Sequence, residues 1–275
     1  MIQPDFIVIG SMKSGTTSLY RWLAAHPDVG MSRDKETDYF IAERSFSRGP
    51  GWYSAQFEPG RKVYGEASPN YTKMDDFRDV PARIRTALPQ VKLIYLVRDP
   101  VDRFMSQYRH SWTMGEISMS PSDLPETDQY THILNTSRYA RQVDAYLSHF
   151  EADRLLIVDF DELIRTPDAA LAQVQRFIGV EPQAVAAGGT HNDNAEVARV
   201  PAPLLRFAQS PFGRSLSRVV SREARDRIRG LVAVRKARQP PAFPPSVRDR
   251  IRDDLRQDAE RFRLLSGRAF AHWSV

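Results

Sequence analysis

Short apolar runs alternate along the chain with segments in which apolar residues recur every three or four positions. Four of these runs are short and rich in β-favouring side chains, as buried strands are. They lie at residues 5–10, 62–65, 92–97 and 155–158, and the run at 92–97 is the strongest. Strands that alternate with helices are typical of a parallel sheet covered on both faces. The pattern therefore predicts an α/β fold with three layers, in which helices flank a central, mostly parallel sheet.

Helical spacing separates and follows the expected strands. We predict helices at 18–25, 81–88, 101–112, 138–149, 168–178 and 246–266, the fifth closed by Gly179 and the last by Gly267. Residues 118–129 show little periodicity and are expected to form a surface loop or flap. After residue 180 the pattern loosens into an Arg-rich, mostly helical stretch at 201–238 and a proline-rich linker. The sequence thus predicts one domain, with a core at 1–180 and an Arg-rich helical C-terminal extension or lid at 181–275.

Charge is distributed unevenly along the 275 residues, whose net charge is +5. Residues 199–275 hold 18 Arg and Lys against 7 Asp and Glu, a net charge of +11, whereas the first 198 residues have a net charge of −6. A basic C-terminal third favours an anionic ligand, an anionic surface or a lid over a charged site. A set of solvated, arginine-rich helices would give the same pattern.

Cysteine is absent from the chain, which excludes disulfides and thiolate metal sites and is compatible with a reducing compartment. No signal peptide is visible, and no apolar run approaches the roughly 20 residues needed to span a bilayer. We therefore expect a soluble, cytoplasmic protein. The excess of arginine over lysine favours a bacterial source of high GC content.

A loop rich in serine and threonine joins the first expected strand to the first expected helix. Its residues are Lys13, Ser14, Gly15, Thr16, Thr17 and Ser18. A loop in this position aims successive backbone N–H groups and a helix N-terminus at an anion, and its hydroxyls add donors. Glycine permits the tight turning and the close backbone approach that such a cradle needs. We therefore predict that the loop binds the phosphate end of a nucleotide, as in a P-loop-like domain.

The position of the lysine distinguishes this loop from that of a nucleoside triphosphatase. The Walker A pattern Gly-x4-Gly-Lys-Ser/Thr requires a lysine directly after its second glycine. Gly10 and Gly15 have that spacing, but Thr16 stands in the lysine position and Lys13 lies inside the loop. The displacement argues against an enzyme that holds Mg²⁺ in the usual way, and favours a lysine that covers the charge on a bridging oxygen. A loop without any ligand is the structural alternative.

A second candidate phosphate site follows the strongest strand. Arg98 leaves the C-terminal end of this strand, where open α/β sheets bind their ligands. Ser106 lies two turns into the next expected helix and can face the same way. An arginine and a serine hydroxyl make a compact site for a second phosphate. The alternative is structural, with Arg98 paired to Asp102 and capping the sheet.

Together, the two sites resemble those of the sulfotransferase superfamily, which uses 3′-phosphoadenosine 5′-phosphosulfate (PAPS). The segment 13–18 is similar to its 5′-phosphosulfate loop, and 98–108 is similar to its 3′-phosphate motif. A further resemblance to the branch of the heparan sulfate N- and 3-O-sulfotransferase domains and their bacterial relatives lies at 33–40, 51–53, 65–71, 155–163 and 264–273. The resemblance covers residues 4–179 well and the C-terminal part thinly.

The resemblance implies a mechanism. An acceptor oxygen or nitrogen attacks the sulfur atom in line, and 3′-phosphoadenosine 5′-phosphate (PAP) leaves. Lys13 and the loop N–H groups stabilise the charge that grows on the leaving phosphate. Glu36, in a segment similar to the Lys-Glu-x-x-Phe-Phe motif of the branch, is the general base. Arg199 lies where relatives have a loop that closes over the nucleotide, and it completes the expected PAPS-binding residues. The reaction requires no metal, and the sequence shows no metal-ligand cluster.

This chain departs from the family pattern at one site position and lacks two other features. In the heparan sulfate 3-O group, a lysine two positions before a proline contributes to the site, whereas this chain has Ala67 there, directly after Glu66. We therefore interpret Glu66 as structural and do not extend the resemblance to polysaccharide recognition. The cysteine pair of the secreted relatives and the glycine-rich motif of the cytosolic animal enzymes are also absent.

We expect a PAPS-dependent sulfotransferase that acts on a hydroxyl, or less readily on an amine, of a small-molecule acceptor. A lipid, glycolipid or saccharide acceptor stays open, as does a homo-oligomer. His110, one helical turn past Ser106, is the alternative general base. The rival class is a P-loop nucleotide kinase or NTPase, which predicts Mg²⁺-dependent ATP binding. Nucleic acid is not expected as a partner, because no motif that reads it is present.

Overall fold

Five strands form one parallel sheet in a computed structural model that describes residues 1–184 and 239–275. The strands are β1 (Phe6–Gly10), β2 (Val29–Met31), β3 (Val63–Ala67), β4 (Lys92–Val97) and β5 (Leu155–Asp159). They are arranged in the order β2-β3-β1-β4-β5, and each neighbouring pair is parallel. The predicted parallel sheet is therefore confirmed. The short strand β2 was not predicted, because three residues with a single buried side chain give no periodicity.

Nine α-helices lie within the described residues. They are α1 (Thr16–Ala24), α2 (Gly49–Ser54), α3 (Val80–Ala87), α4 (Pro100–Thr113), α5 (Asp128–Ser137), α6 (Tyr139–Leu147), α7 (Phe160–Arg165), α8 (Pro167–Ile178) and α12 (Pro245–Ser266). The loop predicted at 118–129 is wrong in part. It holds the 3₁₀ helix η3 (Pro121–Asp123), the fully buried Leu124 and the beginning of α5. None of the described helices is long and apolar enough to cross a membrane.

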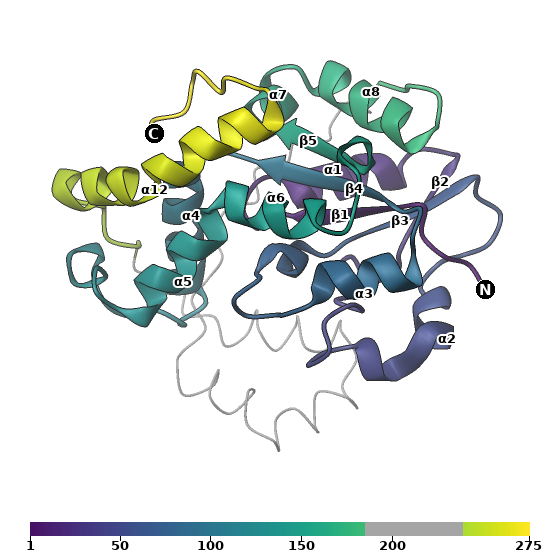
Figure 1. Ribbon diagram of the computed structural model, residues 1–275, viewed down its shortest axis with the longest axis horizontal. Helices are drawn as coiled ribbons and strands as arrows, with labels where there is room; N and C mark the ends of the chain where they lie inside the picture. Colours follow the sequence, from purple (N-terminus) through teal and green to yellow (C-terminus); the bar gives the residue numbers. More distant parts are fainter. Residues whose placement is uncertain (185–238) are drawn as a thin grey trace.

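Side chains alternate between the two faces of the sheet and form two separate cores. On one face, Phe6 and Val8 of β1 and Ile94 of β4 pack against α1 and α8. On the other face, Ile7 and Leu93 pack against α3 and α6. Figure 1 shows α8 and α3 on opposite sides of the strands. The three layers predicted from the sequence are confirmed, and the loops at the carboxyl edge of the sheet are left to form a site.

The last helix, α12, contributes to two cores. Ile251 and Leu255 pack with residues of α4 and α5, whereas Phe262 joins the core that covers α6. Figure 1 shows α12 lying beside α4 and α6 at one end of the molecule. The helix predicted at 246–266 is confirmed, and it ends before Gly267 as expected. The Arg-rich stretch at 201–238 lies outside the described residues, and the division into a core and a lid stays a prediction.

Gly65 in β3 leaves room for an aromatic ring from the neighbouring strand. A Cβ atom at this position would lie 2.1–2.5 Å from three atoms of the fully buried Phe6 ring. We expect Gly65→Ala to displace the ring and to lower the free energy of unfolding by about 1–3 kcal/mol. Gly51→Ala in α2 is the control, because its Cβ would meet open space. Urea denaturation that finds both variants equally stable would contradict this packing.

Candidate functional site

The loop between β1 and α1 is held in place by contacts within the protein. The Ser11 N–H donates to the Leu96 carbonyl oxygen in β4 at 2.7 Å. The hydroxyls of Ser11 and Ser14, both fully buried, share a hydrogen bond of 2.6 Å. Both contacts are made within the protein and restrain the loop backbone. The phosphate-binding role of this loop stays a prediction, and its internal hydrogen bonds show how its backbone is held.

Two residues of the loop adopt left-handed backbone conformations. Gly15 precedes α1 with φ 88°, and a Cβ there would lie 2.9 Å from the Phe160 ring. Lys13 has φ 72°, which is uncommon for a residue with a side chain and costs on the order of 1 kcal/mol or more. Such strain persists where the surrounding structure enforces it, and it is frequent at functional sites. The strained residue is Lys13, the only lysine between β1 and α1.

The N-terminus of α1 is not capped by a side chain from the described residues. The first N–H groups of a helix have no partner within the helix, and the helix dipole favours negative charge there. Thr16 is buried, whereas Thr17 and Ser18 are half-buried at this end of the helix. The predicted residues 14–18 thus surround an open set of backbone donors, as phosphate binding requires.

Arg103 in α4 is a site residue that was not predicted. Its fully buried guanidinium donates to Gln107 Oε1 at 2.7 Å, and to Ser137 Oγ and the Ile133 carbonyl at 2.8 Å each. A longer contact of 3.4 Å reaches the Met12 carbonyl in the loop between β1 and α1, which we call the phosphate loop. Burial lowers the pKa of Arg103 to about 10, so the group stays charged at neutral pH.

No carboxylate within the described residues forms an ion pair with Arg103. Its acceptors are neutral, so the positive charge is solvated without being cancelled. A fixed cation behind a phosphate loop raises the local potential and favours a bound anion. No local sequence pattern predicts a buried cation at this position, because arginine in a helix ordinarily faces solvent.

Arg98 lies two residues before α4, and Ser106 lies within this helix. The Arg98 Nη2 atom is 3.4 Å from the Asp102 carboxylate, and the guanidinium lies over the Phe160 ring, 5.0 Å from its centroid. Asp102 and Ser106 are four residues apart in the helix and therefore share a face. The structural alternative for Arg98 is present as a contact, but a long pair with a half-exposed partner contributes little stability. An incoming phosphate can therefore compete for Arg98.

Three candidates for catalysis gather near the phosphate loop. Glu36 is exposed, and its carboxylate accepts a 2.9 Å hydrogen bond from the Lys35 ammonium. His110 in α4 is partly buried and lies close enough to Lys13 and Glu36 for their charges to act on it. Burial, and then the Lys13 ammonium, lower the pKa of His110, so its ring is neutral at physiological pH. The structure thus brings Lys13, Glu36 and His110 to one region.

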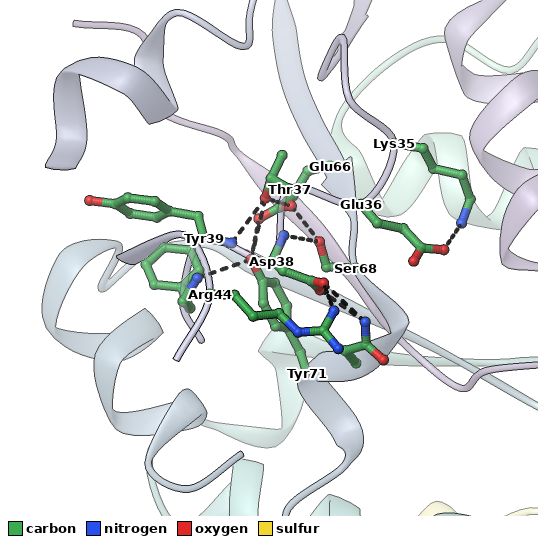
Figure 2. A network of polar contacts seen from close by, with 11 residues as sticks. Lys35, Glu36, Thr37, Asp38, Tyr39, Arg44, Glu66, Ser68 and Tyr71 are labelled. Atoms are coloured by element: carbon green, nitrogen blue, oxygen red, sulfur yellow. Dashed lines mark hydrogen bonds and ion pairs between the residues drawn. The ribbon is translucent and has the colours of Figure 1, made fainter. Parts of the chain in front are cut away.

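Glu66 lies in β3, with its side chain fully buried below the segment that carries Glu36. The carboxylate accepts hydrogen bonds from four hydroxyls, which Figure 2 shows in part. The donors are Tyr53 at 2.6 Å, Ser68 at 2.8 Å, Tyr71 at 3.0 Å and Thr37. Burial raises the pKa of Glu66, and the four hydrogen bonds oppose that rise. A carboxylate enclosed in this way does not contact a substrate, which agrees with the structural role expected for it.

Arg199 and the metal question complete the expectations for the site. Arg199 lies outside the described residues. Across residues 1–184 and 239–275, no group of three or more His, Asp and Glu side chains is arranged to hold a metal ion. The described site is therefore built from cations, hydroxyls and backbone N–H groups, which is the donor set that a phosphate or sulfate group needs.

The sequence matches an established protein family over most of its length. The family model described as "Sulfotransferase domain" matches residues 3–194. The chain belongs to the sulfotransferase domain family. Among similar curated proteins, the mouse heparan sulfate glucosamine 3-O-sulfotransferase 3B1 is 31% identical over 187 residues, and the mouse bifunctional heparan sulfate N-deacetylase/N-sulfotransferase 4 is 28% identical over 201 residues. Each match covers 65% of this sulfotransferase but only 46% and 22% of the two relatives, so the chain spans less than half of their length.

Solved structures share the fold of this sulfotransferase. The sulfotransferase from Alicyclobacillus acidocaldarius has a TM-score of 0.72 and 20% identity, with 100% of both chains covered. The mouse sulfotransferase SULT7A1 complexed with PAP has a TM-score of 0.52 and 15% identity, with 98% of this chain and 88% of that chain covered. At these identities the likeness establishes the fold, and the P-loop-like architecture predicted from the sequence is confirmed.

Arg103 provides a test of how the phosphate loop is supported in this sulfotransferase. Arg103→Met leaves the Gln107 side-chain oxygen as a buried acceptor without its donor, at about 1–3 kcal/mol, and removes one of the donors to the Ile133 carbonyl, which keeps the Ser137 hydroxyl at 3.0 Å. We expect the free energy of unfolding to fall by about 2–5 kcal/mol. Arg109→Met, on the exposed face of the same helix, is expected to change it by less than about 0.5 kcal/mol. Comparable urea midpoints for the two variants would show that the buried guanidinium is dispensable.

Proposed function

We propose that this sulfotransferase transfers a sulfuryl group from PAPS to a hydroxyl, or less readily to an amine, of an acceptor molecule. The observation that carries the proposal is the strained phosphate loop at an uncapped helix N-terminus, with Lys13 inside it and the buried Arg103 behind it. The shared fold with a sulfotransferase that was solved with PAP supports the choice of nucleotide. We favour a small-molecule acceptor, with lipids, glycolipids and saccharides as alternatives, and a cytoplasmic location remains a prediction.

The two ends of the nucleotide are assigned to the two anion sites. The N–H groups and hydroxyls of residues 14–18 bind the 5′-phosphosulfate end. The Lys13 ammonium stabilises the negative charge that develops on the bridging oxygen as the S–O bond breaks. Arg98, just before α4, and Ser106, within it, bind the 3′-phosphate. Arg199 keeps its proposed role as a further nucleotide-binding residue.

The acceptor is activated by a side chain on the other side of the site. In our proposal the acceptor O–H loses its proton to the Glu36 carboxylate while the oxygen forms a bond to sulfur. Glu36 is suited to this step because its side chain is 48% exposed and its described partner is Lys35 alone. An exposed ion pair is worth about 0–1 kcal/mol, so an acceptor can displace it. His110, neutral at physiological pH, is the alternative base.

Ligand binding separates the sulfotransferase proposal from a kinase or NTPase. We expect PAP to raise the melting temperature of the protein equally with and without EDTA, because the proposed phosphate contacts are made by Lys13, Arg98, hydroxyls and backbone N–H groups. A ligand at 100 times its Kd stabilises a protein by about 2.7 kcal/mol, which a thermal-shift assay detects readily. Lys13→Ala should reduce the shift. Stabilisation by ATP with Mg²⁺, and none by PAP, would instead support the rival class.

Substitution of the candidate bases tests the acceptor side of the proposal. We expect Glu36→Gln to lower PAP release from PAPS by about 10²–10⁴-fold, the usual contribution of a general base, while PAP affinity stays unchanged. Glu43→Gln, an exposed residue of the same segment, is the matched control. The assay uses a panel of phenols, alcohols and amino sugars as acceptors. If His110→Asn gives the large loss and Glu36→Gln does not, the base is His110.

A further inference from the structure

The four hydroxyls around Glu66 come from separate parts of the chain. Tyr53 belongs to α2, Tyr71 to the 3₁₀ helix η2 (Pro69–Thr72), and Ser68 directly follows β3. Thr37 belongs to the segment that carries Glu36 and follows it in the sequence. Glu66 therefore joins the end of a central strand to three surrounding elements.

The hydrogen bonds saturate the Glu66 carboxylate. Its Oε1 atom accepts from Tyr53 and Tyr71, and its Oε2 atom accepts from Ser68 and Thr37. Two carboxylate oxygens offer about four lone-pair sites, so each site has one donor. Burial and the nearby Glu66 carboxylate raise the pKa values of Tyr53 and Tyr71 well above the ordinary range, which keeps both phenols protonated. Glu66 thereby determines the direction in which all four hydroxyl protons point.

Three of these hydroxyls use their remaining lone pairs on consecutive backbone N–H groups. The bonds run from Asp38 N–H to Ser68 at 3.1 Å, from Tyr39 N–H to Thr37 at 3.3 Å, and from Phe40 N–H to Tyr71 at 3.2 Å. A hydroxyl that donates to Glu66 can accept from a backbone N–H at the same time. Each N–H of residues 38–40 is therefore connected to Glu66 through one intervening hydroxyl.

The turn at Asp38 needs such support. Asp38 has a left-handed backbone with φ 46°, an uncommon conformation for a residue other than glycine. Its carboxylate accepts from Asn70 Nδ2 at 3.0 Å and pairs with Arg44. The following Tyr39 ring stacks on Tyr53 with centroids 4.2 Å apart. Side chains thus fix the turn from several directions, and the backbone N–H groups are fixed by the Glu66 hydroxyls.

We propose that Glu66 is a positioning residue for sulfuryl transfer, which holds the backbone at 38–40 through three hydroxyls and thereby fixes the place of Glu36. The inference rests on the proposed role of Glu36 as general base. In Figure 2 the Glu36 carboxylate points toward Lys35 and away from Glu66, so Glu66 acts through the backbone. Restraint of this kind raises the fraction of time that a base spends in a productive geometry.

The substitution Glu66→Gln preserves the shape of the side chain and changes its hydrogen bonding. The amide nitrogen donates and cannot accept, so two of the four hydroxyls lose their acceptor. We expect kcat for PAP release to fall at least about 10-fold with the best acceptor of the panel. The Kd for PAP should change less than about 2-fold, because the phosphate loop belongs to another strand–helix connection.

A matched pair of tyrosine variants keeps the proposal testable if Glu66→Gln folds poorly. Tyr53 and Tyr71 are both buried, and each donates one hydrogen bond to Glu66 Oε1. The Tyr71 hydroxyl also accepts the Phe40 N–H, whereas the Tyr53 hydroxyl accepts none of the three N–H groups at 38–40. We expect Tyr71→Phe to lower kcat several-fold more than Tyr53→Phe. The same loss in both variants would contradict a role through the backbone.

A double-mutant cycle tests whether Glu66 acts through Glu36. If it does, adding Glu66→Gln to Glu36→Gln should cost less than about 2-fold in kcat beyond Glu36→Gln alone. If Glu66→Gln lowers kcat as much in the Glu36→Gln background as it does in the parent protein, the effect of Glu66 is independent of the base, and the positioning role is refuted. Titration with PAP gives the fraction of binding-competent protein, which corrects each rate for misfolding.

Hydrogen exchange provides a readout that needs no acceptor. We expect the amides of residues 38–40 to exchange at least about 10-fold faster in Glu66→Gln than in the parent protein, with little change in Glu43→Gln. Unchanged exchange would refute the positioning role, whatever the enzyme transfers. No stabilisation of the parent protein by PAP would instead refute the proposed function, so the two failures are distinguishable.

Discussion

A charged group removed from water must be solvated by the protein, and two fully buried charges of opposite sign meet this requirement near the carboxyl edge of the sheet. Arg103 is surrounded by carbonyl, amide and hydroxyl acceptors, and Glu66 is surrounded by four hydroxyl donors. Neither group has an ion-pair partner among the described residues. The hydrogen bonds that solvate each charge also join elements that are distant in the sequence. The same contacts therefore stabilise the buried charge and hold the site residues in place.

The two charges support different halves of the site. The Arg103 guanidinium contacts the Met12 carbonyl of the phosphate loop, and its uncancelled positive charge favours an anionic nucleotide. The Glu66 carboxylate restrains the segment after Glu36, which belongs to the proposed acceptor side. A neutralising ion pair at Arg103 would leave the hydrogen bonds in place but remove the field. Because neutral dipoles solvate the Arg103 guanidinium, its positive charge can attract an anion, which a charge neutralised by a salt bridge would do far less.

Local sequence patterns were sufficient for the layers of the fold and for the position of the loop between β1 and α1, but not for the buried charges. The strand Lys92–Val97 and the helix α12 are long or apolar enough to be recognised alone, and the loop 13–18 lies between two such elements. By contrast, the acceptors of Arg103 in α5 lie 30 and 34 residues away, and Met12 lies 91 residues away. No local pattern distinguishes Arg103 from the exposed Arg109 six residues later. Leu124 was missed for a similar reason, since a single buried residue gives no period.

Two carboxylates near one another in the fold take different roles because their surroundings differ, as is common at acid–base sites. Glu66 has a donor for each lone-pair site and no exposure, so it can neither reach an acceptor nor accept a further hydrogen bond. Glu36 pairs with Lys35 through one oxygen, and nearly half of its side chain is exposed. The first arrangement suits a group that must not move, and the second suits a group that must exchange partners during a reaction. The sequence places both glutamates in recognisable motifs. Their hydrogen-bond partners, four hydroxyls for Glu66 and Lys35 for Glu36, are what support the proposal that Glu66 positions the site and Glu36 takes part in the chemistry.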